Sequence, residues 1–259
     1  MLLLAFAVTD PEGFEKDERV HILSQHFDTQ LECKQFIDNW EGLRVLDIGC
    51  GEGNLAAMLS FKGALKIDGI DFSAEAIALA KSRLNIPNVN FFCEDYKVIT
   101  EKYDVIVMNG VLEHFDSPWD DLSYIFENLC NINGKIVTTS PGFLNPRGYV
   151  WMTLQLLLDV PMSLSDLHQI SPFDFVQFCN DKNLDLEIKS TDQDWGAGER
   201  TLIDFNKRLR NALRDANLNN QNVDKLLDWL KKAMPYFNTD EYSGAMIAYK
   251  LSKKCSSVE

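Results

Sequence analysis

The sequence predicts an α/β fold built on a doubly wound, mostly parallel sheet. Five short apolar segments alternate with helical segments between residues 44 and 139, which is typical of such a sheet. Glycine or acidic residues follow directly after several of these segments. The chain has 259 residues, of which 46% are hydrophobic, and no repeat or flexible linker marks a second domain. We therefore expect a single globular domain with insertions.

The first five predicted strands lie in the N-terminal half of the chain. The fourth is nearly all apolar, as expected for a strand buried on both faces. Ser73 is a suitable N-cap for the helix that follows the second strand, and Asn133-Gly134 is expected to form a turn before the fifth. The strands are predicted at residues 44–48, 66–70, 89–93, 103–108 and 135–139, and the helices between them at 54–60, 74–84 and 120–129.

Helical segments are also predicted before and after this alternating core. Apolar spacing at residues 14–40 predicts one or two N-terminal helices, and two amphipathic helices broken around 217–222 are expected within residues 200–234. Further helices are expected at 149–158 and 171–182, and further strands at 184–188 and 243–251. The single domain, 1–259, is thus expected to comprise N-terminal helices (1–42), a cofactor-binding core (43–140), a lid (141–170) and a helical insertion before the last strand (199–240).

Charge and cysteine content exclude several classes of protein. The 25 Lys and Arg against 39 Asp and Glu give a net charge of -14, which disfavours nucleic acid and anionic membrane as partners. The six cysteines form no CxxC pair and no metal-ligand spacing with His, so no metal site is expected. Because the apolar start of the chain lacks a basic segment and no apolar run could span a bilayer, we expect a soluble cytoplasmic protein.

The residues after the first two strands predict a nucleoside-containing cofactor. Gly49, Gly51 and Gly53 allow a ligand to approach the backbone closely. Asp71 follows the second strand about twenty residues later, where it can accept hydrogen bonds from ribose hydroxyls. A dinucleotide fingerprint would need glycine where Asn54 stands, so the spacing favours a different cofactor.

Four segments resemble the motifs of class I S-adenosylmethionine-dependent methyltransferases. Residues 45–54 are similar to motif I, 70–73 to the acidic ribose-binding motif and 93–96 to the segment that meets adenine; residues 103–115, with Val-Leu-Glu-His at 111–114, resemble the ubiquinone-biosynthesis-like branch. The resemblance implies a Rossmann-like, seven-stranded sheet whose last strand is antiparallel, with S-adenosylmethionine as cofactor. It implies cofactor contacts from Asp47, Gly49, Cys50, Gly51, Gly53, Asp71, Phe72, Glu94, Asp95, Tyr96, Asn109 and Gly110.

Two histidines are candidates for the base that removes a proton from the methyl acceptor. His168 precedes the helix at 171–182, where the family often carries a histidine, and His114 with Glu113 follows the fourth strand. For each candidate the alternative is structural: His168 could only form hydrogen bonds, and Glu113 and His114 could only cap the next helix. His21 and His26 are expected to be partly buried surface residues of the N-terminal helices.

The acceptor is expected to contact the variable segments over the strand ends. An acidic loop at 191–199 could hold a cationic amine or guanidine compound through charge and cation–π contacts. The charged helices at 200–234 are expected to be a solvated face rather than a nucleic-acid patch. The candidate acceptor contacts are Arg147, Tyr149, Trp151, Asp192, Asp194, Trp195 and Glu199.

These observations leave three classes of function. The motifs best support methyl transfer to an O or N atom of a small molecule in a biosynthetic pathway. A catalytically silent S-adenosylmethionine-binding sensor or partner protein would carry the same motifs. A nucleotide-dependent oxidoreductase is disfavoured by Asn54. We expect a monomer or homodimer with no partner beyond the small-molecule acceptor.

Overall fold

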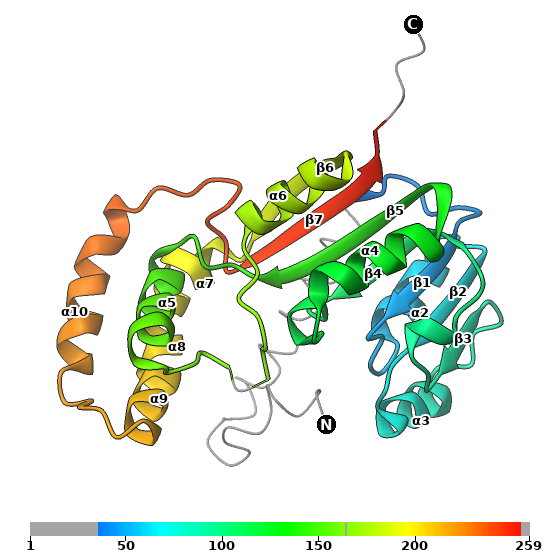
Figure 1. Cartoon of the computed structure of the whole chain (residues 1–259). Coiled ribbons are helices and arrows are strands. Elements are labelled where there is room, and N and C mark those ends of the chain that lie inside the picture. Colours follow the sequence, from blue (N-terminus) through cyan, green and yellow to red (C-terminus); the bar gives the residue numbers. More distant parts are fainter. Residues whose placement is uncertain (1–35, 164, 255–259) are drawn as a thin grey trace, which may run out of the picture. The chain divides into compact units, whose positions relative to one another are not determined.

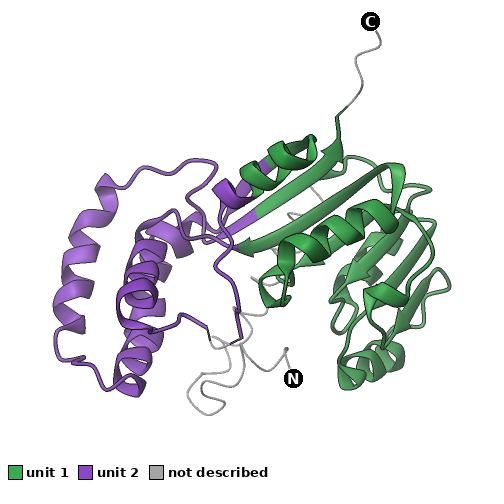
Figure 2. Ribbon diagram, viewed as in Figure 1, with its two compact units in different colours: residues 1–140, 175–187, 248–259 green, residues 141–174, 188–247 purple. Residues whose placement is uncertain are grey.

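The computed structural model describes residues 36–163 and 165–254. The helices expected at 14–40, including His21 and His26, therefore lie almost wholly outside the described residues. The described chain divides into two compact units (Figure 2). Unit 1 contains residues up to 140, 175–187 and those from 248 onward, and unit 2 contains residues 141–174 and 188–247. Unit 2 thus combines the lid and the insertion expected from the sequence.

A seven-stranded sheet runs through the fold in the order β3-β2-β1-β4-β5-β7-β6 (Figure 1). The strands are β1 (Arg44–Ile48), β2 (Lys66–Ile70), β3 (Val89–Phe92), β4 (Tyr103–Asn109), β5 (Cys130–Pro141), β6 (Leu184–Thr191) and β7 (Met246–Lys253). The first five pair in parallel. The arrow of β7 points opposite to that of β5, which confirms the predicted antiparallel last strand.

The order of strands reverses beside β1. This strand pairs with β2 on one side, where Val45 is opposite Ile67, and with β4 on the other, where Val45 is opposite Val105. Ligands in open α/β sheets bind outside the carboxyl ends of the strands at such a point. The topology therefore predicts a ligand site at the carboxyl end of β1, where the glycines follow this strand.

The helices of unit 1 connect these strands. Their bounds are α2 (Asn54–Phe61), α3 (Ala74–Arg83), α4 (Pro118–Asn128) and α6 (Pro172–Lys182), with short 3₁₀ turns η2 (Tyr96–Val98) and η3 (Leu112–His114). Ser73 caps α3 as predicted, because its hydroxyl accepts a hydrogen bond from the amide of Ala76. Apolar side chains from the sheet and helices form one core, including Val45, Leu59, Ile67 and Val137.

Unit 2 is helical apart from the strand ends. It contains α5 (Pro146–Leu158), α7 (Gln193–Ala197), α8 (Glu199–Asp204), a π-helical turn η4 (Phe205–Leu209), α9 (Arg210–Asp215), α10 (Val223–Ala233) and η5 (Met234–Tyr236). Its core gathers Trp151, Phe205, Leu209, Val223 and Leu230. The break predicted around residues 217–222 separates α9 from α10. No helix in the described ranges is long and apolar enough to cross a bilayer.

Two predicted boundaries are wrong. The Asn133-Gly134 turn does not form, because both residues lie within β5. A register shift in the pairing of β5 with β4 lies between Tyr103 and Val105, and a methyl group on Gly134 would lie 3.0 Å from the carbonyl oxygen of Tyr103. The last strand begins at Met246 rather than at residue 243, and a methyl group on Gly244 before it would lie 2.0 Å from the carbonyl oxygen of Thr191.

Candidate functional site

The three glycines after β1 form a tight loop that leads into α2. Gly49, Gly51 and Gly53 have φ angles of 71°, 54° and 78°, a region that disfavours residues with a Cβ. The amides of Gly49 and Cys50 both donate to the carbonyl of Ile70, at 2.8 and 3.0 Å. The predicted strand, glycine loop and helix are confirmed, and the loop is fastened to the end of β2.

Packing explains two of these glycines independently of any ligand. A methyl group on Gly49 would lie 2.4 Å from Val111 Cγ2, and one on Gly53 would lie 2.3 Å from Phe91 Cζ. Cys50 is buried, and burial followed by the nearby charges of Asp47 and Asp71 raises the pKa of its thiol above the usual range. The thiol is therefore suited to packing and not to nucleophilic chemistry.

Asp71 connects the glycine loop to the start of α3. Its two carboxylate oxygens accept hydrogen bonds from the amide of Gly51 at 3.0 Å and from the amide of Ser73 at 2.8 Å. A carboxylate has about four acceptor positions, so this carboxylate retains capacity for ligand hydroxyls. The next residue along the chain, Phe72, is 63% exposed, so its aromatic ring is accessible to a ligand.

Asp47 brings a second carboxyl group to the same edge of the sheet. It is only 1% exposed, and its Oδ2 atom has no hydrogen-bond partner in the described part of the chain. Burial, and secondly the charge of Asp71, raise the pKa of Asp47 to about 7. Since an ionised carboxylate without a partner is costly to bury, this position favours a positively charged ligand.

The end of β4 contributes the next group of predicted site residues. Thr139 donates its hydroxyl to Asn109 Oδ1 at 2.8 Å, and the amide of Gly110 donates to that hydroxyl oxygen at 3.0 Å. Gly110 has a φ of 63°, and a methyl group on it would lie 3.6 Å from an oxygen of Glu113. Glu113 is buried and His114 is half-buried, both within η3. These side chains belong to unit 1, as the glycine loop does.

The segment after β3 is organised by its own hydrogen bonds. Asp95 accepts a hydrogen bond from the amide of Lys97 and thereby caps η2. The hydroxyl of Tyr96 donates to Asp121 at 2.5 Å, and its ring stacks on Phe115 with centroids 5.4 Å apart. Glu94 and Asp95 are exposed, whereas Tyr96 is buried. The tyrosine side chain therefore supports the segment rather than facing solvent.

Two predicted acceptor contacts belong to the core of unit 2. Arg147 donates from Nε to Asp204 at 2.8 Å, and Trp151 donates from Nε1 to the same oxygen at 3.2 Å. Asp204, expected on a solvated face, is in fact buried. Burial alone would raise its pKa, but the charges of Arg147 and Arg208 and the hydrogen bonds from Arg147 and Trp151 outweigh it and hold that pKa below its usual range. This part of the solvated-face expectation is wrong.

The acidic loop expected at 191–199 is helical instead. Asp192 has a left-handed φ of 55°, and its carbonyl accepts hydrogen bonds from the amides of Trp195 and Gly196, which starts α7. Asp194 forms an ion pair with Arg200 at 3.2 Å, so its charge is already compensated. Glu199 and Tyr149 are exposed, and Trp195 is half-buried.

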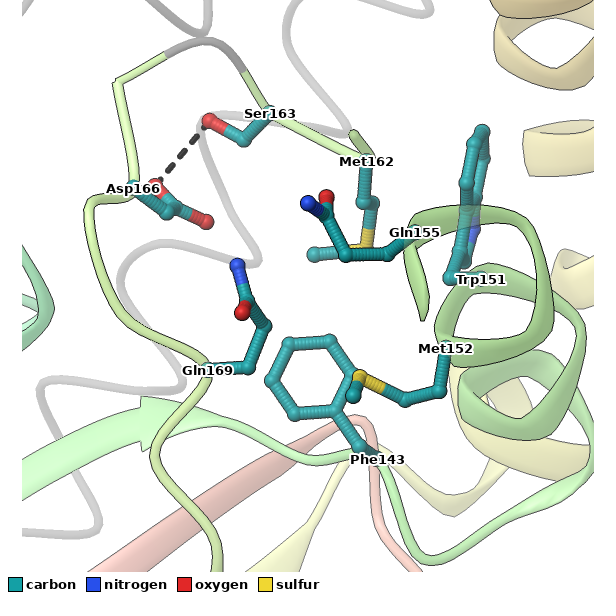
Figure 3. Close-up of a pocket in the computed structure, with 8 residues that line it drawn as sticks. All are labelled: Phe143, Trp151, Met152, Gln155, Met162, Ser163, Asp166 and Gln169. Atoms are coloured by element: carbon teal, nitrogen blue, oxygen red, sulfur yellow. Dashed lines mark hydrogen bonds between the residues drawn. The ribbon is translucent and has the colours of Figure 1, made fainter. Parts of the chain in front are cut away.

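His168 lies in unit 2, in the half-buried segment between α5 and α6. The same segment borders a small hollow of about 10 Å³ (Figure 3). The carboxamides of Gln155 and Gln169 point into this space, and neither has a hydrogen-bond partner within the described ranges. Aromatic and thioether side chains and a hydrogen-bonded Ser163–Asp166 pair complete the walls, together Phe143, Trp151, Met152, Met162, Ser163 and Asp166. The hollow has room for about one water molecule.

A family model described as a methyltransferase domain matches residues 26–223. The chain belongs to this methyltransferase family. The match confirms the resemblance predicted from the glycine loop and the three other motifs. In the described part of the chain, no group of three His, Cys, Asp or Glu side chains could hold a metal ion.

Curated relatives match about a third of this chain. The malonyl-[acyl-carrier protein] O-methyltransferase of Bacillus anthracis is 40% identical over 91 residues, covering 34% of this chain and 32% of that protein. The ubiquinone biosynthesis O-methyltransferase of Coxiella burnetii is 35% identical over 83 residues, covering 30% and 35%. The chain thus spans about a third of the length of these relatives.

A solved structure shares the fold over most of the chain. A SAM-dependent methyltransferase from Archaeoglobus fulgidus superposes with a TM-score of 0.57 at 17% identity, covering 88% of this chain and 94% of that one. At this identity the likeness shows the fold alone. The predicted seven-stranded, Rossmann-like architecture is confirmed.

The sequence did not predict that Gln155 and Gln169 line one hollow in this methyltransferase. They are separated by 14 positions along the chain, and only the fold of the segment between them places both amides in one hollow. A sequence signal existed for Gln155, because it follows Trp151 by four residues on the same face of α5. No periodic signal marks Gln169, which lies outside regular secondary structure.

Proposed function

We propose that the chain binds S-adenosylmethionine at the glycine loop and transfers its methyl group to an O or N atom of a small molecule. The observation that carries this proposal is the buried Asp47, whose Oδ2 atom has no hydrogen-bond partner among the described residues and whose pKa is raised to about 7. S-adenosylmethionine is a nucleoside that also carries a positive charge, and this charge would compensate the negative charge of the buried carboxylate. Neutral nucleosides would not.

The surrounding residues fit the other parts of such a ligand. Asp71 has acceptor capacity left for ribose hydroxyls, and the exposed ring of Phe72 offers a surface for a purine. Glu94 and Asp95 are exposed after the neighbouring strand, where they can accept a hydrogen bond from an amino group. The left-handed glycines keep the loop free of side chains that would block a close approach.

The bound cofactor would supply a methyl group on a sulfonium, which needs little beyond alignment with the acceptor. A hydroxyl or protonated amine acceptor also has to lose a proton. We propose His168, His114 and Glu113 as the groups that can accept it. Glu113 and His114 follow β4 in the unit that holds the glycine loop, and His168 lies in unit 2.

The nature of the acceptor is a finer part of the proposal. Both curated relatives named above are O-methyltransferases, which favours an oxygen acceptor. Asp192 and Glu199 favour an acceptor that carries an amine or guanidine group, although Asp194 is already paired with Arg200. Methylation of anionic or uncharged hydroxyl compounds alone would contradict the cationic part of this proposal.

Calorimetric titration with S-adenosylmethionine, S-adenosylhomocysteine and NAD tests the cofactor. We expect binding of the first two and none of NAD; the reverse would overturn the proposal in favour of an oxidoreductase. Asp71→Asn should weaken binding about tenfold or more, since it removes a charge-assisted acceptor. Asp185→Asn, an exposed residue of β6, is the matched control and should bind as the wild type does.

Methyl transfer itself is tested with an isotope-labelled donor and a pool of metabolites, read by mass spectrometry. We expect one labelled small-molecule product. Binding of the cofactor without any labelled product would instead identify a catalytically silent sensor or partner protein.

A further inference from the structure

A second hollow lies in unit 1, at the end of the sheet opposite to the end that carries the glycine loop. It is open to solvent on one side and has a volume of about 350 Å³, between the C-terminal halves of α4 and α6, the start of β6 and the end of β7. The glycine loop follows the carboxyl end of β1, which runs parallel to β4 and β5, whereas β7 runs the opposite way (Figure 1). The hollow is therefore separate from the proposed cofactor site.

Lysines dominate the charge around this hollow. Lys182, Lys253 and Lys254 line it, against the single acidic residue Glu127. Lys182 is paired with Glu127 at 3.5 Å. Within the described ranges, neither Lys253 nor Lys254 has an ion-pair partner. Two adjacent cations that have no ion-pair partner among the described residues create a local positive field in this acidic chain, and such a field favours an anion.

The charges of Lys253 and Lys254 also act on two cysteines of unit 1, and Lys102 acts with Lys253 on the first of them. Burial raises the pKa of Cys130 to about 12, and Lys253 acts in the opposite direction. Burial likewise raises the pKa of Cys179 to about 11, opposed by Lys254. Cations are often stabilised by the carbonyls at a helix C-terminus, which accounts for Lys182 at the end of α6. Lys253 and Lys254 stand at the end of a strand, so this explanation does not cover them.

Apart from its charged residues, the hollow is lined by apolar side chains and by one hydroxyl group. Phe126, Phe178 and Leu184 contribute buried side chains. Ser123, in α4, has a buried hydroxyl oxygen with no hydrogen-bond partner in the part of the chain that the structure covers. A hydroxyl in this position can donate to an anionic oxygen, and the aromatic rings can pack against a ligand's apolar part.

We infer that this hollow binds a small anionic ligand in which a carboxylate or phosphate is joined to an apolar group. Lys253 and Lys254 would hold the anion, and Phe126 and Phe178 would contact the apolar part. Because this hollow and the glycine loop lie at opposite ends of the strands, the ligand of the hollow is not the methyl acceptor.

Titration calorimetry with phenyl phosphate tests this inference, with inorganic phosphate and benzyl alcohol as comparisons. We expect phenyl phosphate to bind more tightly than either, since only it satisfies both parts of the hollow. Lys253→Gln/Lys254→Gln should weaken its binding about tenfold or more. Lys62→Gln/Lys81→Gln changes two exposed lysines elsewhere in unit 1 and should leave binding unchanged.

The inference would be overturned if the wild type bound neither phenyl phosphate nor vesicles of anionic phospholipid. It would also be overturned if the Lys253/Lys254 variant bound phenyl phosphate as tightly as the wild type does. Vesicle binding that this variant loses, without binding of phenyl phosphate, would assign the same site to a lipid headgroup. S-adenosylmethionine binding by the variant serves as the folding control. It also separates this site from the proposed function, because either ligand can fail to bind while the other binds.

Discussion

Asp47 illustrates how one residue can oppose stability and support binding. Its carboxyl is buried without a partner for one oxygen, and its pKa is raised to about 7. The folded protein therefore holds a proton on this group at pH values where the unfolded chain has lost it. Stability from this group is present at low pH and declines as the pH rises from about 4 to about 7.

Asp47→Asn should remove that decline. We expect urea unfolding to show the variant more stable than the wild type at pH 8 by roughly 2–4 kcal/mol, with little difference at pH 4. S-adenosylmethionine binding at pH 8 should weaken about tenfold, because the counter-charge is lost. A variant less stable than the wild type at pH 8 would show that Asp47 is stabilised by its surroundings.

The three candidate bases can be distinguished by kinetics once an acceptor is found. Removing the true base should lower kcat by a factor of about 10²–10⁴ while cofactor affinity stays constant. We expect this for His168→Ala, with His114→Ala and Glu113→Gln measured in parallel by labelled product formation. Full activity of the first variant would remove His168 as the base and leave the pair in η3.

At the scale of elements, the glycine loop depends on both conformation and packing. Gly53 and Gly42 have nearly equal φ angles, 78° and 76°. A methyl group on Gly53 would lie 2.3 Å from Phe91, whereas one on Gly42 would meet nothing within 4 Å. The two positions therefore separate the cost of the left-handed conformation from the cost of the clash.

Gly42→Ala should destabilise the protein by about 1–2 kcal/mol, the conformational cost alone. Gly53→Ala should cost a further 1–3 kcal/mol or so because Phe91 has to move. Equal losses in urea unfolding would mean that β3 and the loop adjust freely.

The buried pair of Arg147 and Asp204 links α5 to α8 within unit 2. Arg147→Met leaves Asp204 without its closest cation, which typically costs about 3–5 kcal/mol for a buried pair. We expect hydrogen exchange to accelerate in α5 and α8. Arg214→Met breaks the exposed pair with Asp215 and should change stability by less than about 1 kcal/mol. Exchange rates equal to those of the wild type in both variants would contradict a structural role for Arg147.

At the scale of the whole molecule, the net charge of -14 predicts how the chain responds to polyanions. We expect no RNA binding at physiological salt in a filter-binding assay, since repulsion opposes contact over most of the surface. Micromolar binding would contradict this. If that binding disappeared in Lys253→Gln/Lys254→Gln, it would be traced to the second hollow.

The sequence by itself determined the succession of strands and helices along the chain, the glycine loop and the position of Asp71 after the second strand. These features are local: strand and helix periodicity, left-handed turns and caps are set by residues close together along the chain. The turn expected at Asn133-Gly134 shows the limit of this reasoning, because both residues lie within β5, at an irregularity in its pairing with β4.

Only the tertiary structure decided which polar groups are buried, and beside which partners. Asp204 is 57 positions from Arg147, and Ser123 is far along the chain from Lys253, so no local pattern connects them. Asp47 appeared in a recognisable motif, but its raised pKa follows from burial within the sheet and from the charge of Asp71, which comes directly after the neighbouring strand β2. Burial and long-range electrostatics depend on the folded chain, and they give this methyltransferase its charged sites.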